Sequence, residues 1–159
     1  MILLRSTPEA LIFELEPVWI GFLEFLFQAY PMGMEGWPPA PNAPQLPPSG
    51  PDPALLADAL RHLKEASRRE ASTFLERTLH VAASNTSAEW RVPRDKTEWL
   101  LQVANEVRVG CWYRLGCPDA ELPELMLSQN QENGQTLVLF ALATNLIGEL
   151  LEALQAPIE

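Results

Sequence analysis

Eight prolines fall between residues 31 and 51, and this cluster constrains the fold more than any other feature of the sequence. Proline lacks a backbone N–H and clashes with the preceding turn of a helix, so residues 31–52 favour an extended loop over a helix. Trp37 and the nearby methionines are typical of a loop packed on its own domain; a proline-rich segment that docks in an aromatic groove is the alternative. The chain has the length of one domain, so we expect a single domain, 1–159, that contains this loop.

On either side of the loop the sequence predicts a mainly α fold, a bundle of four or five helices with a small N-terminal antiparallel strand pair. The pair consists of two short β-leaning runs, residues 2–4 and 10–15, separated by a turn-forming cluster. Residues 90–92 are a candidate for a further short strand that joins this pair. The apolar spacing predicts helices over 18–30, 53–80, 96–114, 121–128 and 136–154, the second of them as one long helix or as two that join near residues 66–71.

Several residues mark the expected helix ends. Pro17 suits a first helical position, where its missing N–H has no partner to lose. Asp95 has the pattern of an N-cap, with Glu98 three residues later as in a capping box. Gly116 is expected to end that helix in the left-handed conformation. The helix over 18–30 is apolar nearly all round, so we expect it at the centre of the core.

The charge of the chain argues against several classes of partner. A net charge of −10, with an isoelectric point near 4.6, is unfavourable for binding nucleic acid or an anionic membrane surface. Even the most basic stretch, residues 53–80, sets five basic side chains against four acidic ones. The longest apolar stretches are shorter than the ~20 residues of a membrane-spanning helix. The N-terminus lacks the features of a signal peptide, so we expect a cytoplasmic protein.

No residue pattern in the sequence indicates catalysis or metal binding. His62 and His80 are the two histidines, and on one continuous helix they would lie ~27 Å apart, too far to share an ion. The sequence has no Cys-x-x-Cys pair, no His-Glu-x-x-His helix and no glycine-rich phosphate loop between a strand and a helix. We therefore expect no catalytic residues, no bound metal and no cofactor.

The stretch over residues 105–117 carries most of the remaining information. Cys111 lies on an apolar stripe with the valines four and eight residues before it, and this stripe would face the core. Asn105 and Arg108 are adjacent on a neighbouring face, where they would anchor a backbone or a carboxylate. Arg114 lies near the end of the helix, where a cation complements the helix dipole.

The two cysteines, Cys111 and Cys117, are six residues apart. In a continuous helix they lie ~9 Å apart along the axis, and this separation excludes a disulfide. If Gly116 is the left-handed residue after the helix, a Schellman closure folds Cys117 back onto the last turn and brings the sulfurs into bonding range with modest adjustment. Such a bond would be strained and reducible, as in a redox switch. Two buried small apolar side chains are the alternative.

The same region contains Trp99, the run Asn105–Val109 and Arg114–Gly116, and it is followed by a leucine-rich final helix over 137–154. In these residues the chain resembles a bacterial family of uncharacterised cytoplasmic proteins, domain-of-unknown-function family 2017. The resemblance covers residues 95–154 best, and the proline-rich loop departs from it. Some relatives are regarded as oxidative-stress regulators that form an internal disulfide and engage a sigma factor, which implies that Cys111 and Cys117 are the sensing pair here.

We therefore expect a non-catalytic regulatory or adaptor domain that acts through contacts with a protein partner. The alternative is a thiol switch in which a Cys111–Cys117 disulfide controls a transcription-factor partner. The third hypothesis is an enzyme of unknown class. Apolar surface on the first and last helices is consistent with a homodimer, and a buried core explains it equally well.

Overall fold

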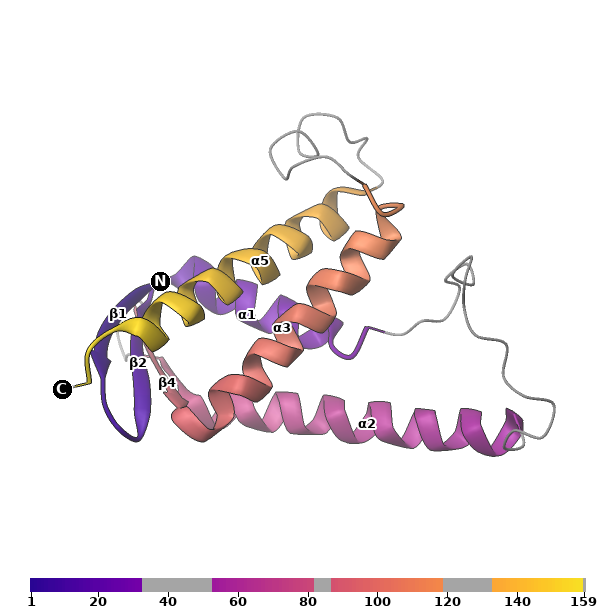
Figure 1. Ribbon diagram of the computed structural model, residues 1–159, viewed down its shortest axis with the longest axis horizontal. Coiled ribbons are helices and arrows are strands. Elements are labelled where there is room, and N and C mark those ends of the chain that lie inside the picture. The colour runs from indigo at the N-terminus through magenta and orange to yellow at the C-terminus, as the bar shows by residue number, and fades with distance from the viewer. Residues whose placement is uncertain (33–52, 82–86, 119–132, 159) are drawn as a thin grey trace.

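The computed structural model describes residues 1–32, 53–81, 87–118 and 133–158, and within these ranges the chain forms four helices and four strands (Figure 1). In chain order they are β1 (Ile2–Ser6), β2 (Ala10–Leu15), α1 (Pro17–Ala29), α2 (Pro53–Thr78), β3 (Leu79–Val81), β4 (Ala88–Pro93), α3 (Arg94–Arg114) and α5 (Gly134–Gln155). The predicted mainly α class is confirmed. Residues 33–52 of the proline-rich loop and the expected helix over 121–128 lie outside the described residues.

The sheet is larger than the predicted strand pair. Its four strands are all antiparallel in the order β1-β2-β4-β3, so β2 and β4 are central and β1 and β3 form the edges. The expected strand over 90–92 lies within β4, where Trp90 pairs with Phe13 of β2 and with Leu79 of β3. Sequence analysis missed β3 because its three residues follow α2 directly and Leu79 continues the apolar spacing of that helix.

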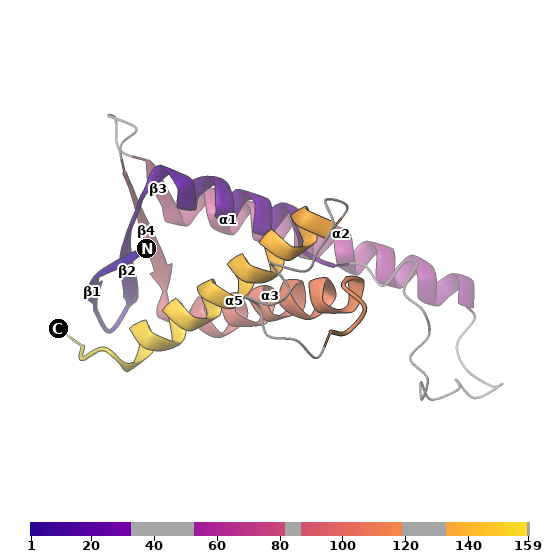
Figure 2. The same ribbon diagram turned by 90° about the horizontal axis from the view of Figure 1, so that it is seen from above.

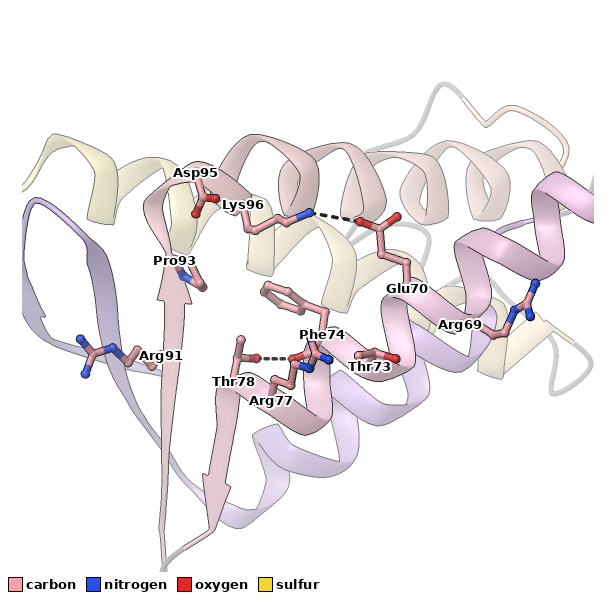
Figure 3. Close-up of a pocket in the computed structure, with 10 residues that line it drawn as sticks. All are labelled: Arg69, Glu70, Thr73, Phe74, Arg77, Thr78, Arg91, Pro93, Asp95 and Lys96. Atoms are coloured by element: carbon pink, nitrogen blue, oxygen red, sulfur yellow. Dashed lines mark hydrogen bonds and ion pairs between the residues drawn. The ribbon is translucent and has the colours of Figure 1, made fainter.

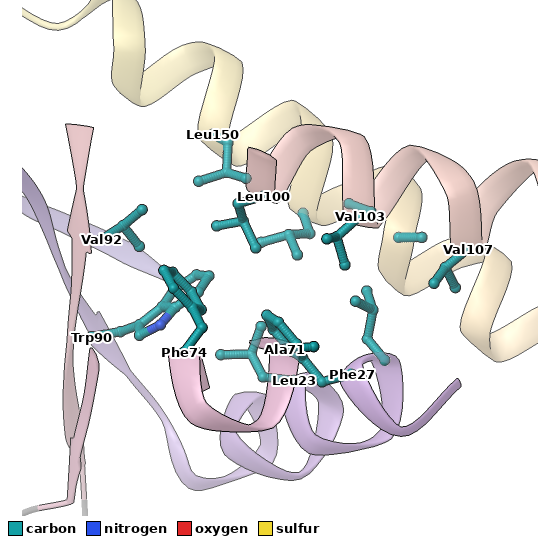
Figure 4. Close-up of a cluster of buried hydrophobic side chains, with 14 of the residues drawn as sticks. Leu23, Phe27, Ala71, Phe74, Trp90, Val92, Leu100, Val103, Val107 and Leu150 are labelled. Atoms are coloured by element: carbon teal, nitrogen blue, oxygen red, sulfur yellow. The ribbon is translucent and has the colours of Figure 1, made fainter. Parts of the chain in front are cut away.

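The helices form two pairs that meet the sheet at one end. α5 packs along α3, and α1 lies alongside α2, as Figure 2 shows. Side chains from all four helices and from the inner face of the sheet share one core (Figure 4). Its largest completely buried side chain is Trp90, whose ring lies 5.9 Å from that of Phe13. Phe74 of α2 contacts the rings of Phe27 and Trp99 at centroid distances of 6.0 and 5.0 Å.

α1 does not lie at the centre of the core, in contrast to the prediction from its apolar sequence. Its buried side chains, Leu23, Leu26 and Phe27, are confined to one face, and Val18 is 51% exposed. The difference arises because α1 meets α2, α3 and α5 from one side, so its other face stays at the surface. Pro17 occupies the first helical position, as predicted.

The start of α3 also differs from the prediction. The helix begins at Arg94, directly after β4, so the N-cap is Pro93 and Asp95 lies within the first turn. No side chain caps this helix start, because the chain passes from strand to helix without a linking residue. The Arg94 guanidinium instead fixes it to the β1–β2 turn by donating to the Thr7 carbonyl and the Ser6 hydroxyl, each at 2.6 Å.

α5 is long and apolar enough to cross a membrane by length and composition alone, although the longest apolar stretches in the sequence are shorter than such a span. The helix exceeds those stretches because it also includes polar residues such as Thr144 and Asn145. Seven of its side chains, between Leu137 and Ala153, are buried in the fold. α5 is therefore a core helix of this structure, and most of its packing is against α3.

Candidate functional site

The cysteine pair from the sequence lies at the C-terminal end of α3. Gly116 has a left-handed φ of +85°, and its N–H donates to the carbonyl of Tyr113 at 3.0 Å. The N–H of Cys117 donates to the carbonyl of Trp112, also at 3.0 Å, and these two bonds make a Schellman closure. The predicted left-handed end at Gly116 is therefore confirmed, and Cys117 follows it with a φ of 56°.

Both thiols are free in this closure. Cys111 is completely buried, and burial raises the pKa of its thiol to about 11. The positive charge of Arg114 lowers that pKa, and it is the smaller effect. Because the thiolate is the reactive form of cysteine, Cys111 has the character of a buried apolar side chain near neutral pH. Cys117 is partly exposed.

The residues that carry the family resemblance do not converge on one site. Asn105 and Arg108 are adjacent on α3, as predicted, but among the described residues they bond to each other and not to the expected backbone group or carboxylate. Asn105 Oδ1 accepts two hydrogen bonds from the Arg108 guanidinium, at 2.8 and 3.3 Å. The pair lines a hollow of about 450 Å³ between α3 and α5. Trp99 packs against Phe74, whereas Arg114 is exposed in the last turn of α3.

The two histidines lie on different elements. His62 is exposed on α2, where its Nε2 atom lies 3.4 Å from Asp58 Oδ2, and His80 is exposed on β3. Within the described ranges, no group of three or more His, Cys, Asp or Glu side chains could hold a metal ion.

A basic cavity of about 640 Å³ lies between the C-terminal half of α2, β4 and the start of α3 (Figure 3). Its wall carries four cations and two carboxylates, whereas the whole chain has a net charge of −10. The cations are Arg69, Arg77, Arg91 and Lys96, and the carboxylates are Glu70 and Asp95. Sequence analysis missed this cavity because its residues come from three elements. The basic residues of α2 alone are typical of a solvated helix face.

The apolar residues of the cavity wall are Phe74, which is 8% exposed, and Pro93. Thr78 lies one turn further along α2, where its hydroxyl accepts a hydrogen bond from Trp90 Nε1 at 3.1 Å and donates one to the Phe74 carbonyl at 2.8 Å. These two bonds connect the cavity wall to the largest side chain of the core.

The cations of the basic cavity differ in how they are paired. Lys96 forms an ion pair with Glu70 at 3.2 Å, and Arg69 donates to a backbone carbonyl of its own helix at 3.3 Å. The side chains of Arg77 and Arg91 have no ion pair or hydrogen bond within the part of the chain that the structure describes. Figure 3 shows Arg77 beside Phe74, with the guanidinium groups of Arg69 and Arg91 extending toward opposite ends.

Residues 55–63 of α2 lie beyond the rest of the fold that the structure describes. α2 is one continuous helix, and every side chain from residue 55 to residue 63 is exposed. Figure 1 shows this part of the helix projecting beyond α3. Its leucines, which are 37% to 69% exposed, are Leu55, Leu56, Leu60 and Leu63. Residues 55–63 are called the leucine arm below.

Three leucines of the arm continue the stripe by which α2 enters the core. Leu56, Leu60 and Leu63 are spaced by four and three residues, and the same helix face leads through Ser67 to the buried residues of α2. Tyr30, directly after α1, hydrogen bonds to the Ser67 side chain. The rest of the described fold therefore packs on this helix face only as far as Ser67. From Leu63 to Leu56 the stripe is exposed.

No protein-family model, no curated protein and no solved structure matches this chain. The family resemblance therefore stays a prediction. Inferences about function rest on the three features described above: the cysteine pair, the basic cavity and the leucine arm.

Proposed function

We propose that the chain is a non-catalytic regulatory or adaptor domain that binds a protein partner through the leucine arm. The observation that carries the proposal is the open stripe of Leu56, Leu60 and Leu63, each at least 37% exposed. Removing apolar surface from water contributes about 25 cal/mol of favourable free energy per Å². A complex in which a partner packs on this stripe is therefore stabilised. The i, i+4, i+7 spacing is the pattern by which a helix contacts a groove or a second helix. We infer an amphipathic helix as the partner element.

Active sites gather groups with shifted pKa values in a cleft. Burial raises the pKa values of Tyr30, Glu106 and Cys111, and the charge of Glu106 adds to the rise at Tyr30. None of the three lines the basic cavity, so a binding role suits that cavity better than catalysis. A cytoplasmic location is part of the proposal, because both thiols stay reduced there.

A thiol switch is the second candidate, and one observation favours it. The Schellman closure at Gly116 folds Cys117 toward the last turns of α3, which carry Cys111. The burial of Cys111 and its raised pKa oppose the reaction, so a disulfide would require the end of α3 to open.

Photo-crosslinking in cells of the source organism tests the adaptor proposal. A benzophenone amino acid replaces Leu60 on the open stripe, and a matched control replaces Arg61, whose side chain is 64% exposed on another face of the same helix. We expect a crosslinked protein at Leu60 that is absent at Arg61. The purified partner should then bind the wild-type chain, and Leu63→Glu should weaken binding about tenfold, as for a central apolar contact.

Three results would overturn this proposal. The first is the absence of a crosslink specific to Leu60, and the second is a partner whose affinity is unchanged by Leu63→Glu. The third is a crosslink between two copies of the chain, supported by a dimer in sedimentation analysis. That result would assign the arm to a homodimer interface.

A further inference from the structure

We propose that the basic cavity binds an extended acidic segment of the partner, with acidic side chains at positions i and i+4 and an apolar side chain at i+2. The inference rests on the proposed function, because it names the chemistry of the same partner. The leucine arm lies in the first half of α2, at residues 55–63. The α2 residues that line the basic cavity lie in the second half, between residues 69 and 78. One partner can therefore contact both.

The charges of the cavity select an anion. Four cations against two carboxylates give its wall a surplus of two positive charges on a chain with a net charge of −10. Arg77 and Arg91 have no internal partner among the described residues. An incoming carboxylate can therefore bind their guanidinium groups without breaking an existing ion pair. Charge-assisted bonds between arginine and carboxylate are among the strongest hydrogen bonds in proteins.

The start of α3 adds backbone donors to the same wall. The first N–H groups of a helix have no partner within the helix, and Pro93 supplies no side-chain cap. The Arg94 N–H already donates to the Glu9 carbonyl at 2.9 Å, so the donors that remain for a ligand are the N–H groups of Asp95 and Lys96. Asp95 and Lys96, both in this first turn, line the cavity. The positive end of the helix dipole therefore adds to the attraction for an anion, and the Asp95 carboxylate offsets part of it.

The length of the cavity favours a peptide over a small anion. Arg69 and Arg77 are eight residues apart on α2, which corresponds to ~12 Å along the helix. Figure 3 shows the Arg69 guanidinium extending away from Arg77, so in this arrangement one carboxylate or phosphate group does not contact both. In an extended segment, side chains at i and i+4 point to the same side and lie ~13 Å apart. The side chain at i+2 then meets Phe74, which lies between the two arginines along the helix.

The test measures binding of a defined peptide to the full chain by fluorescence anisotropy at low salt. The peptide is Ala-Glu-Ser-Leu-Ser-Glu-Ala with an uncharged dye, and a second peptide replaces both glutamates with glutamine. We expect the glutamate peptide alone to bind, with an affinity that falls as salt is added. Arg77→Glu should weaken binding about tenfold or more. Arg61→Glu makes the same charge change outside the cavity and should weaken it at most about twofold.

Several outcomes would overturn the proposal. Equal binding of the glutamine peptide would exclude charge selection, and equal losses in the two variants would exclude the cavity as the site. Inorganic pyrophosphate that displaces the peptide at a concentration below the dissociation constant of the peptide would identify a small-anion site. If a peptide with serine in place of leucine binds as tightly, the cavity does not recognise an apolar side chain at i+2, and that part of the proposal is rejected. Circular dichroism of both variants checks that the fold is intact.

The leucine arm is tested separately, by the crosslinking experiment at Leu60 and by the affinity of the purified partner for Leu63→Glu. Peptide binding together with a failed crosslinking test would reject the leucine arm and keep the cavity. A crosslinked partner together with a peptide that does not bind would reject the cavity and keep the adaptor function.

Discussion

Met32 and Gly110 touch so closely that a side-chain carbon at Gly110 would lie 2.8 Å from the Cβ atom of Met32. Both residues are buried, and the contact ties the chain after α1 to the second half of α3. Glycine is required here because it allows the two segments to approach without a Cβ atom between them. The contact also places Met32, from the start of the proline-rich loop, in the core.

Gly110→Ala should lower the free energy of unfolding by about 1–3 kcal/mol, because Met32 Cβ is fixed to the backbone and cannot swing away. Urea denaturation measures the change. The matched control is Gly148→Ala in α5, where the new Cβ meets no atom within 4 Å. There the better helix propensity of alanine should raise stability by about 0.5–1 kcal/mol. Changes of the same sign at both glycines would contradict the packing argument.

Thr78→Val should destabilise the protein by about 1–3 kcal/mol, because it leaves the buried N–H of Trp90 without its acceptor. Thr78→Ser keeps the hydroxyl and should cost less than Thr78→Val. Chemical denaturation followed by tryptophan fluorescence gives both values. A serine variant as unstable as the valine variant would contradict the hydrogen-bond argument, because serine keeps the hydroxyl that Trp90 Nε1 bonds to.

The thiol of Cys111 should make stability fall with pH in the alkaline range. Its pKa rises from an ordinary 9.0 to about 11 on folding, so the unfolded chain loses this proton at a lower pH. The contribution is fully present below about pH 9 and is lost as pH rises to about 11. Relative to Cys111→Ala, the wild-type free energy of unfolding should fall by on the order of 2–3 kcal/mol across this window. Parallel pH profiles for the two proteins would contradict the assignment.

Mass spectrometry of the intact chain after graded peroxide and an alkylating quench tests the thiol switch. Because Cys111 is completely buried, we expect the folded protein to be alkylated at Cys117 alone and to form no internal disulfide. A loss of two hydrogen atoms that a reductant reverses, and that Cys111→Ser and Cys117→Ser both abolish, would show the switch. Unfolding in denaturant should expose Cys111 and give a second alkyl group.

Features set by a residue's own backbone were predictable from the sequence. Pro17 begins α1, and Gly116 ends α3 with a φ of +85°, because fixed or permissive φ angles act locally. β3 was not predictable, since its three residues owe their conformation to pairing with β4. Asp95 has the local signature of an N-cap, but Pro93 ends the strand and starts the helix two residues earlier than that signature indicates.

The candidate sites were harder to predict than the elements. Arg77, Arg91 and Lys96 belong to different elements, and only the fold brings them to one cavity. The leucines of the arm follow the same helical spacing as the buried Phe74. No local signal separates a leucine that faces the core from one that faces solvent, because the difference depends on where α1 ends.

The pairing of β2 with β4 has a consequence for the rate of folding. It joins Leu15 to Ala88 and Ala10 to Pro93, although the whole of α1, the proline-rich loop and α2 separate them along the chain. The entropy of closing so long a loop opposes the pairing before any contact between the strands can stabilise it. The helices rest on local contacts and should form early, so closure of the sheet sets the time the chain needs to reach its native state.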